Sequence, residues 1–320
     1  MINFFSKLKF SIFFIIVFSI AFFKEIENLP VFSIEKYLPG DLLSQNPTKL
    51  ARSPITFADS NLEQAIREKI KIAAPKPLTS EDLSQITKLD LEAKSITSLE
   101  GIESLTNLTE LNLKYNYSIS DLTPLSQLTK LEKLTLEKNK IKDISPLKGL
   151  TELEWLSLDD NQIVDLSPLK GLTELEWLSL HDNHIVDLSP LQNLTELEWL
   201  SLHDNRIVEI NSLKSLTELE WLSLDDNEIV NISPLSDLKQ LEWLSLHDNQ
   251  IVSIVALKNL KQLEWLSLND NQIVDITPLA NLSNLETLNL SYNQIKDFSA
   301  LKNDPKITDC SGCKLTEQDF

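Results

Sequence analysis

The chain has 320 residues and is strongly acidic, with 48 aspartates and glutamates against 29 lysines and arginines and a formal net charge of −19. This balance argues against nucleic acid and against an anionic membrane surface as partners, because both are bound by basic patches.

The N-terminal segment has the pattern of an export signal. Lys7 and Lys9 precede an apolar stretch at residues 10–23, and a positive segment followed by a short apolar one is typical of a secretory signal. We therefore predict residues 1–23 to be a signal peptide, which makes the protein secreted, periplasmic or exposed at the cell surface. An uncleaved membrane anchor at residues 10–23 is the alternative. Residues 24–56 contain four prolines and no strong periodicity, and are predicted to be a partly disordered linker.

A helical cap is predicted at residues 57–85. The Ser-Asn-Leu-Glu sequence at residues 60–63 fits a capping box, in which the first and fourth side chains bond the free backbone groups of a helix start. The apolar residues that follow share one helical face, which is suited to covering the first coil of a solenoid. They are Leu62, Ala65, Ile66 and Ile70.

A 22-residue repeat fills most of the chain, and all six tryptophans recur with it. Residues 153–163 read L-x-x-L-x-L-x-x-N-x-I, the pattern of a leucine-rich repeat. In this coil we predict a strand at residues 155–158, a turn at Asn161, and a return segment whose proline favours 3₁₀ or extended backbone over a long helix. About ten such coils between residues 86 and 303 predict an α/β-type leucine-rich repeat solenoid, shaped as a right-handed curved horseshoe.

One asparagine per coil is predicted to be structural. An amide side chain carries both a donor and an acceptor, so it can bond its own turn and the neighbouring turn. The step from the first to the second member is 23 residues instead of 22, which predicts a local bulge. The column consists of Asn116, Asn139, Asn161, Asn183, Asn205, Asn227, Asn249, Asn271 and Asn293.

The C-terminal residues 304–320 are predicted to form a degenerate cap. Ile307, Cys310 and Gly312 fall where the leucines of an eleventh coil would lie. In an exported chain, Cys310 and Cys313 favour a disulfide that fastens this coil. A core role for Cys310 without a disulfide is the alternative.

These repeats resemble those of the bacterial internalins, which are also 22 residues long and return through an I-S-D-I-S-P-L type segment, as residues 142–147 do here. Residues 57–70 and 78–83 resemble the helical cap that precedes internalin repeats. The resemblance implies a leucine-rich repeat fold and a non-catalytic binding role, but no particular partner. The repeat also resembles that of the eukaryotic protein-phosphatase-1 regulatory leucine-rich repeat protein, so an intracellular scaffold or regulatory subunit is an alternative.

Side chains on the strands define the candidate binding surface. Because side chains alternate between the faces of a strand, inward leucines leave the tryptophan, the following serine and the next acidic or histidine residue pointing outward on the concave face. The tryptophan column is Trp155, Trp177, Trp199, Trp221, Trp243 and Trp265. The second column of candidates is Asp159, His181, His203, Asp225 and His247.

We predict that these columns bind a basic protein or peptide, because acidic side chains attract cations and Lys or Arg side chains can lie over indole rings. A glycan that stacks on the indoles, with its hydroxyls bonded to the serine and aspartate columns, is the runner-up. Alternatively, the tryptophans were copied by recent duplication and stack on one another. No enzyme activity, cofactor or metal is predicted, since the histidines lie on an open face. Membrane contact is predicted only through an uncleaved N-terminal segment.

Overall fold

The computed structural model describes residues 54–301 and 309–313. The predicted signal or anchor at residues 1–23, nearly all of the predicted linker and most of the predicted C-terminal cap lie outside these ranges. None of the helices in the described ranges is both long enough and apolar enough to cross a membrane.

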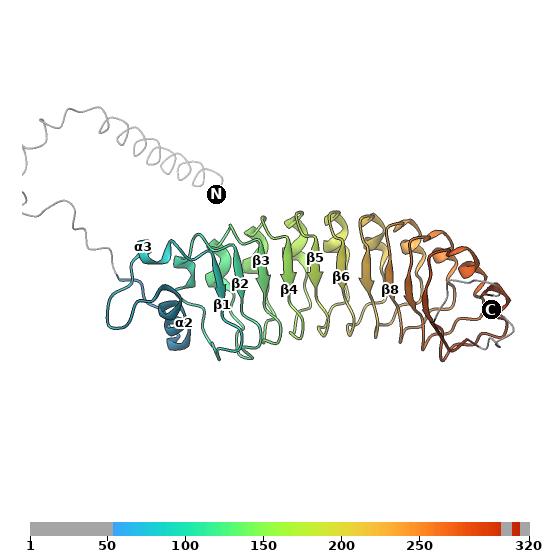
Figure 1. The fold of residues 1–320 in the computed structure, drawn as a ribbon, viewed down its shortest axis with the longest axis horizontal. Coiled ribbons are helices and arrows are strands. Elements are labelled where there is room, and N and C mark those ends of the chain that lie inside the picture. Colours follow the sequence, from blue (N-terminus) through green and yellow to red (C-terminus); the bar gives the residue numbers. More distant parts are fainter. Residues whose placement is uncertain (1–53, 302–308, 314–320) are drawn as a thin grey trace, which may run out of the picture. The chain divides into compact units, whose positions relative to one another are not determined.

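Eleven short parallel strands form one sheet in chain order, so each coil of the repeat adds one strand beside its predecessor (Figure 1). The first ten strands confirm the ten predicted coils, and an eleventh strand at residues 309–311 falls within the predicted C-terminal cap, which stays a prediction. The strands are β1 (Lys88–Asp90), β2 (Glu110–Asn112), β3 (Lys133–Thr135), β4 (Trp155–Ser157), β5 (Trp177–Ser179), β6 (Trp199–Ser201), β7 (Trp221–Ser223), β8 (Trp243–Ser245), β9 (Trp265–Ser267), β10 (Thr287–Asn289) and β11 (Asp309–Ser311).

Short 3₁₀ segments lie on the return path of the coils, as the prolines predicted. Each has three to five residues, and most begin with a Ser-Pro or Thr-Pro pair. They are η3 (Ile102–Ser104), η4 (Thr123–Gln127), η5 (Ser145–Gly149), η6 (Ser167–Gly171), η7 (Ser189–Asn193), η8 (Asn211–Ser215), η9 (Ser233–Asp237), η10 (Val255–Asn259), η11 (Thr277–Asn281) and η12 (Ser299–Leu301).

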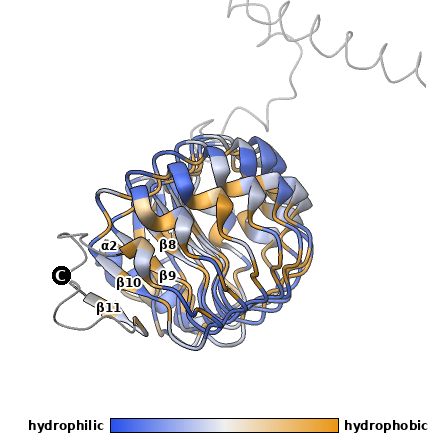
Figure 2. Ribbon diagram, turned by 90° about the vertical axis from the view of Figure 1, so that its right-hand side faces the viewer, coloured by the Kyte–Doolittle hydropathy of each residue, from blue (hydrophilic) through white to orange (hydrophobic). Residues whose placement is uncertain are grey.

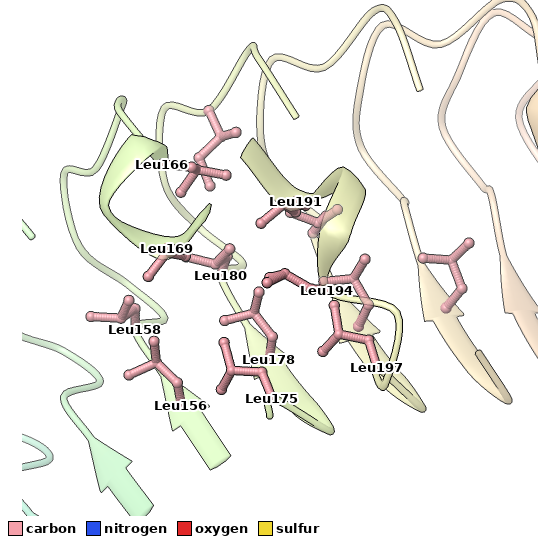
Figure 3. Packing of buried hydrophobic residues seen from close by; sticks show 14 of the residues in the cluster. Leu156, Leu158, Leu166, Leu169, Leu175, Leu178, Leu180, Leu191, Leu194 and Leu197 are labelled. Atoms are coloured by element: carbon pink, nitrogen blue, oxygen red, sulfur yellow. The ribbon is translucent and has the colours of Figure 1, made fainter. Parts of the chain in front are cut away.

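The core is one continuous column of leucine and isoleucine side chains between the sheet and the 3₁₀ segments. Viewed from the end, the coils stack on one another in the same orientation (Figure 2). Leucines of adjacent coils point into the shared interior and pack against each other (Figure 3). In the fourth coil the buried residues are Leu153, Leu156, Leu158, Ile163, Leu166, Leu169 and Leu172. No coil could bury these side chains alone, so stacking is what makes the core.

The predicted leucine-rich repeat solenoid is confirmed, and its strands lie in one open sheet that does not curl (Figure 1). The curvature of a solenoid comes from a small rotation at each repeat, which grows when the elements on one side are wider than those on the other. Here the elements behind the sheet are tight 3₁₀ turns and not α-helices.

The cap contains helix α2 (Ser60–Ile70) and the short helix α3 (Ser80–Leu83). The α2 start differs from the prediction: Asp59 is the capping residue, and its carboxylate accepts hydrogen bonds from the backbone N–H groups of Asn61 (2.8 Å) and Leu62 (3.2 Å). The predicted capping box at residues 60–63 is therefore wrong: the helix is capped one residue earlier, and Leu62 at the fourth position has no polar side chain to complete a box. The other carboxylate oxygen of Asp59 accepts the N–H of Thr97 at 2.7 Å, which joins the cap to the first coil.

The predicted apolar face of α2 is confirmed. Leu62 and Ile66 are fully buried, and Ala65 and Ile70 pack against the same core. This face covers the leucines of the first coil, which would otherwise be exposed to water.

The asparagine column bonds neighbouring coils together, as predicted. Asn205 illustrates the pattern: its Nδ2 donates to the carbonyl of Leu202 in its own coil (3.0 Å) and to that of Leu180 in the preceding coil (3.1 Å). Its Oδ1 accepts the backbone N–H of Ile185, also in the preceding coil, at 2.9 Å. One side chain therefore satisfies backbone groups of two turns.

The single 23-residue step produces a bulge, as the sequence predicted. Tyr115 and Tyr117 both have a positive φ (59° and 58°), whereas most of the later turns contain one such residue. The buried Oδ1 of Asn139 has no hydrogen-bond partner, although the equivalent oxygen of Asn161 accepts the N–H of Ile141 at 3.0 Å. The extra residue thus displaces the donor that Asn139 would meet.

The last strand ends in the cysteine pair. Cys310 takes the position of a core leucine, because it pairs in register with Leu288, and both cysteines pack partly buried against the core. The Cα atoms of Cys310 and Cys313 lie 5.6 Å apart with their sulfurs in contact, a separation that a disulfide accommodates. The disulfide stays a prediction, compatible with a core role for Cys310.

We expect Asn205→Ala to lower the free energy of unfolding by about 1–3 kcal/mol, because buried backbone groups of two coils lose their partners. Urea unfolding followed by circular dichroism measures this change. Asn193→Ala is the matched control, since Asn193 is exposed in the adjacent 3₁₀ segment. Equal stability of the two variants would contradict the structural role of the column.

Candidate binding surface

The six tryptophans form one continuous stack along β4 to β9. Neighbouring strands pair tryptophan with tryptophan in register, so each indole lies beside the next. Ring centroids are 3.9 to 4.3 Å apart, and the ring planes differ by 6 to 10°. All six side chains are half-buried. At one end, Nζ of Lys133 lies 4.2 Å from the ring centroid of Trp155.

This packing corrects the prediction that a Lys or Arg side chain, or a sugar, lies over the faces of the indole rings along the column. The inner indole faces cover one another, so neither a Lys or Arg side chain nor a sugar ring can enter between them. The ring edges remain as the accessible part of the stack. The part of the duplication hypothesis that predicted stacked indoles is confirmed; whether the stack also binds a partner is a separate question.

The serine column is not available to a ligand, which removes the serine contacts proposed for glycan hydroxyls and leaves only the aspartate contacts. The serine two residues after each tryptophan is at most 3% exposed. Ser157 donates its hydroxyl to Oδ2 of Asp159 at 2.9 Å, and Ser223 donates to Oδ2 of Asp225 at 2.7 Å. The serines therefore hold the neighbouring acidic side chains in place.

The second predicted column divides into buried carboxylates and half-buried histidines. Asp159 and Asp225 are 4% and 7% exposed, and each accepts the backbone N–H of the histidine in the next coil, from His181 at 3.1 Å and from His247 at 2.9 Å. His181 and His203 stack with ring centroids 4.2 Å apart. His247 is not part of this stack; it follows β8, and its Nε2 lies 3.7 Å from Oδ2 of Asp225.

Burial raises the pKa of two carboxyls on this side of the coils, those of Asp159 and Asp226. Desolvation raises the pKa of Asp159 above the ordinary aspartate value, against the lowering effects of His181 and of two serine hydroxyls. Desolvation also raises the pKa of Asp226, and the neighbouring Asp204 adds to the effect by charge repulsion. In both cases the charged form is disfavoured because water is partly removed around it.

The outermost aspartates of the turns have a conformational reason to be present. Each lies just before the ladder asparagine in left-handed backbone with φ between 48° and 54°. Aspartate tolerates this region better than most non-glycine residues do. The residues are Asp160, Asp182, Asp204, Asp226, Asp248 and Asp270. This column therefore needs no partner to explain it.

A glutamate column beside the tryptophans lacks such an explanation. One exposed glutamate immediately precedes each tryptophan, as Glu198 precedes Trp199. Within residues 54–301, no lysine, arginine or histidine lies at ion-pair distance from them. This set, called here the glutamate column, is Glu154, Glu176, Glu198, Glu220, Glu242 and Glu264. Sequence reasoning noted these residues only as general flanking charge.

The glutamate column and the tryptophan stack share a hollow of about 300 Å³. It is lined by Glu110, Glu132, Lys133, Glu154, Trp155, Glu176, Trp177, Glu198 and Trp199. A larger hollow of about 600 Å³ lies along α2 and contains none of the column residues. The strand-side hollow is therefore the one that combines acidic side chains with aromatic edges.

Sequence reasoning also missed a column of exposed valines. One valine per coil follows the buried isoleucine after the asparagine turn and is 40 to 57% exposed. The recurring Ile-Val pair was the signal that could have revealed it. The column is Val164, Val186, Val208, Val230, Val252 and Val274.

We expect Trp199→Ala to lower the free energy of unfolding by about 2 kcal/mol, because the ring is stacked on both faces and each aromatic pair contributes about 0.5–1.5 kcal/mol. Trp265→Ala should cost less, since Trp265 has one stacked tryptophan and Thr287 on its other side. Urea unfolding compares the two variants. An equal cost would show that stacking contributes little to stability.

We expect Asp159→Asn to report the raised pKa of this carboxyl through pH-dependent stability. A raised folded-state pKa means that the folded chain holds a proton that the unfolded chain has lost, so the stability contributed by Asp159 falls as pH rises from about 3.8 through the folded-state pKa. The wild type should therefore be most stable relative to the variant at low pH and least so at neutral pH. Asn269, at the equivalent position, shows that the fold accepts asparagine there. Urea titrations at several pH values that gave a constant difference would refute this.

Comparison with known protein families identifies these coils as leucine-rich repeats. Profiles described as "Leucine Rich repeats (2 copies)" match residues 106–149 and 261–303, and one described as "Leucine rich repeat" matches residues 129–185, 151–207, 173–229 and 217–273. No curated protein matches the chain significantly.

Solved structures give closer relatives. An internalin of Listeria monocytogenes, InlF, is 39% identical with a TM-score of 0.80, and the match covers 82% of this chain and 79% of that one. Internalin C2 of the same organism is 38% identical with a TM-score of 0.61, over 73% and 94% of the two chains. A leucine-rich repeat protein of Leptospira interrogans is 28% identical with a TM-score of 0.65, over 68% and 57%. With its repeat length, its parallel sheet and these relatives, the chain belongs to the internalin-type family of bacterial leucine-rich repeat proteins.

Proposed function

We propose that this protein is a non-catalytic, extracytoplasmic binding module whose strand-side face holds a basic protein or peptide. The observation that carries the proposal is the glutamate column, which runs along the tryptophan stack with no cation of the described residues paired to it. Leucine-rich repeat proteins of this kind act by presenting such extended surfaces to partners.

The spacing of the column defines the partner more closely. Adjacent strands lie about 4.8 Å apart, so six aligned glutamates place like charges repeatedly at short range. Like charges on directly neighbouring strands destabilise a sheet. A segment with several Lys or Arg residues relieves this repulsion, while the aliphatic parts of its side chains pack on the exposed indole edges.

The same geometry favours a basic peptide over a glycan as the partner. A glycan recognised by stacking needs free indole faces, and the inner faces of the stack are covered. Its hydroxyls would also need the serines, which are buried. Duplication accounts for the recurrence of the tryptophans and of the glutamates alike, so binding measurements are what separate it from a functional surface.

An extracytoplasmic location is supported by the export-signal pattern at residues 1–23. It is also in keeping with the internalin-type relatives. A secreted form and a form anchored by residues 10–23 both present the repeats outside the cytoplasm. Either location favours this role over that of an intracellular scaffold.

The test uses a synthetic extended peptide with lysine at alternate positions as the probe, and fluorescence anisotropy as the measurement. We expect the triple variant Glu176→Gln, Glu198→Gln, Glu220→Gln to weaken binding by about tenfold, because exposed charge pairs contribute about 0.2–1 kcal/mol each. Raised salt should weaken wild-type binding as well, since it screens exposed charges.

The matched control is the triple variant Glu174→Gln, Glu196→Gln, Glu218→Gln. It changes the net charge by the same amount on the same three coils, but its glutamates lie two residues earlier and away from the indoles. Equal weakening by both variants would reduce the effect to net charge and contradict a site at the glutamate column. A wild-type protein that ignores the peptide but binds a neutral oligosaccharide would favour the glycan instead.

A further inference from the structure

We propose that His181, Asp182 and His203 form a binding site for a divalent transition-metal ion of the Zn²⁺ class. The three residues follow β5 and β6, on the side of the sheet that carries the tryptophans. One potential ligand atom from each lies within 4.8 Å of the other two. Imidazole nitrogens and carboxylate oxygens are ligands that Zn²⁺, Ni²⁺ and Cu²⁺ accept.

The two histidine rings present their Nδ1 atoms toward carboxylates. Nδ1 of His181 lies 2.9 Å from Oδ2 of Asp182, and Nδ1 of His203 lies 2.8 Å from Oδ2 of Asp204. The rings are nearly parallel, at 10°, so these two edges run side by side. His181, Asp182 and His203 supply three of the four ligands of tetrahedral Zn²⁺, and water can take the fourth position on this open face. Ligands of tetrahedral Zn²⁺ lie about 3.3 Å apart, which these partly exposed side chains reach by small rotations.

A buried carboxylate stands behind His181, in the position of an orienting group. Oδ2 of Asp159 lies 3.5 Å from Nε2 of His181, on the opposite edge of the ring from Asp182. Asp159 itself is fixed by hydrogen bonds from Ser157, Ser179 and the backbone N–H of His181. Metal-binding histidines commonly donate their second ring N–H to a carboxylate, which fixes the tautomer and leaves the other nitrogen free for the metal.

The backbone of the site is held before any ion arrives. Asp182 is in the left-handed region with φ of 52°, and its N–H bonds the carbonyl of His203 at 3.1 Å. A similar arrangement at Asp226, His247 and Asp248 contains one histidine only. Because imidazole nitrogen distinguishes a transition-metal site from an oxygen-only site, the pair of histidines at His181 and His203 marks the stronger of the two.

The experiment is isothermal titration of the metal-free full chain with Zn²⁺, with Ca²⁺ as the comparison ion. We expect one tight Zn²⁺ per chain and no Ca²⁺ binding at the same concentrations. His203→Asn should lower Zn²⁺ affinity at least tenfold; the fold already accepts asparagine here, since Asn269 occupies the equivalent position. Asp159→Asn should lower it by about 10–100-fold through loss of ring orientation.

Two controls separate this site from other ligands of the chain. His184→Gln removes the only histidine outside the column, whose Nδ1 lies 2.8 Å from the carbonyl of Asn183. The double variant Cys310→Ser, Cys313→Ser removes both sulfur atoms. Both should bind Zn²⁺ as the wild type does. Absence of tight Zn²⁺ binding by the wild type, or an equal loss in His203→Asn and His184→Gln, would overturn the proposal. Circular dichroism of each variant verifies that the repeats remain folded.

Discussion

The structure depends on the constraint that no coil of this repeat can bury its own leucines. A three-residue strand and a 3₁₀ turn of up to five residues enclose too little volume for a core, so each coil is stable only between neighbours. The ladder asparagines make this dependence specific, because each satisfies backbone groups of two successive turns. Hydrophobic burial brings the coils together, and the amide bonds set their register.

That register has a consequence for every other side chain. Residues 22 apart occupy the same place on adjacent strands, so each outward position becomes a column of similar groups about 4.8 Å apart. For indoles this spacing is favourable and produces a face-to-face stack. For glutamates it is unfavourable, because identical charges are held at close range. The same repeat spacing therefore stabilises the tryptophan stack and causes charge repulsion within the glutamate column.

The acidic character of the chain therefore has more than one origin. The turn aspartates occupy left-handed backbone, and Asp159 and Asp225 hold the buried serines and the adjacent strand. These groups serve the fold. The glutamate column has neither role, and it borders the tryptophan stack. We infer a basic partner from this difference between acidic groups that the fold uses and acidic groups that it does not use.

The sequence by itself determined the repeat length, the number of coils, the inward leucines, the structural asparagines and the bulge at the 23-residue step. These features follow from local periodicity and from the hydrogen-bonding capacity of one amide. Only the tertiary structure decided that the indole faces are closed, that the serines are buried, that Asp59 caps α2, and that the sheet does not curl. Each of these depends on how close neighbouring coils approach, and that distance is set by packing across coils and not by the residues of any one coil.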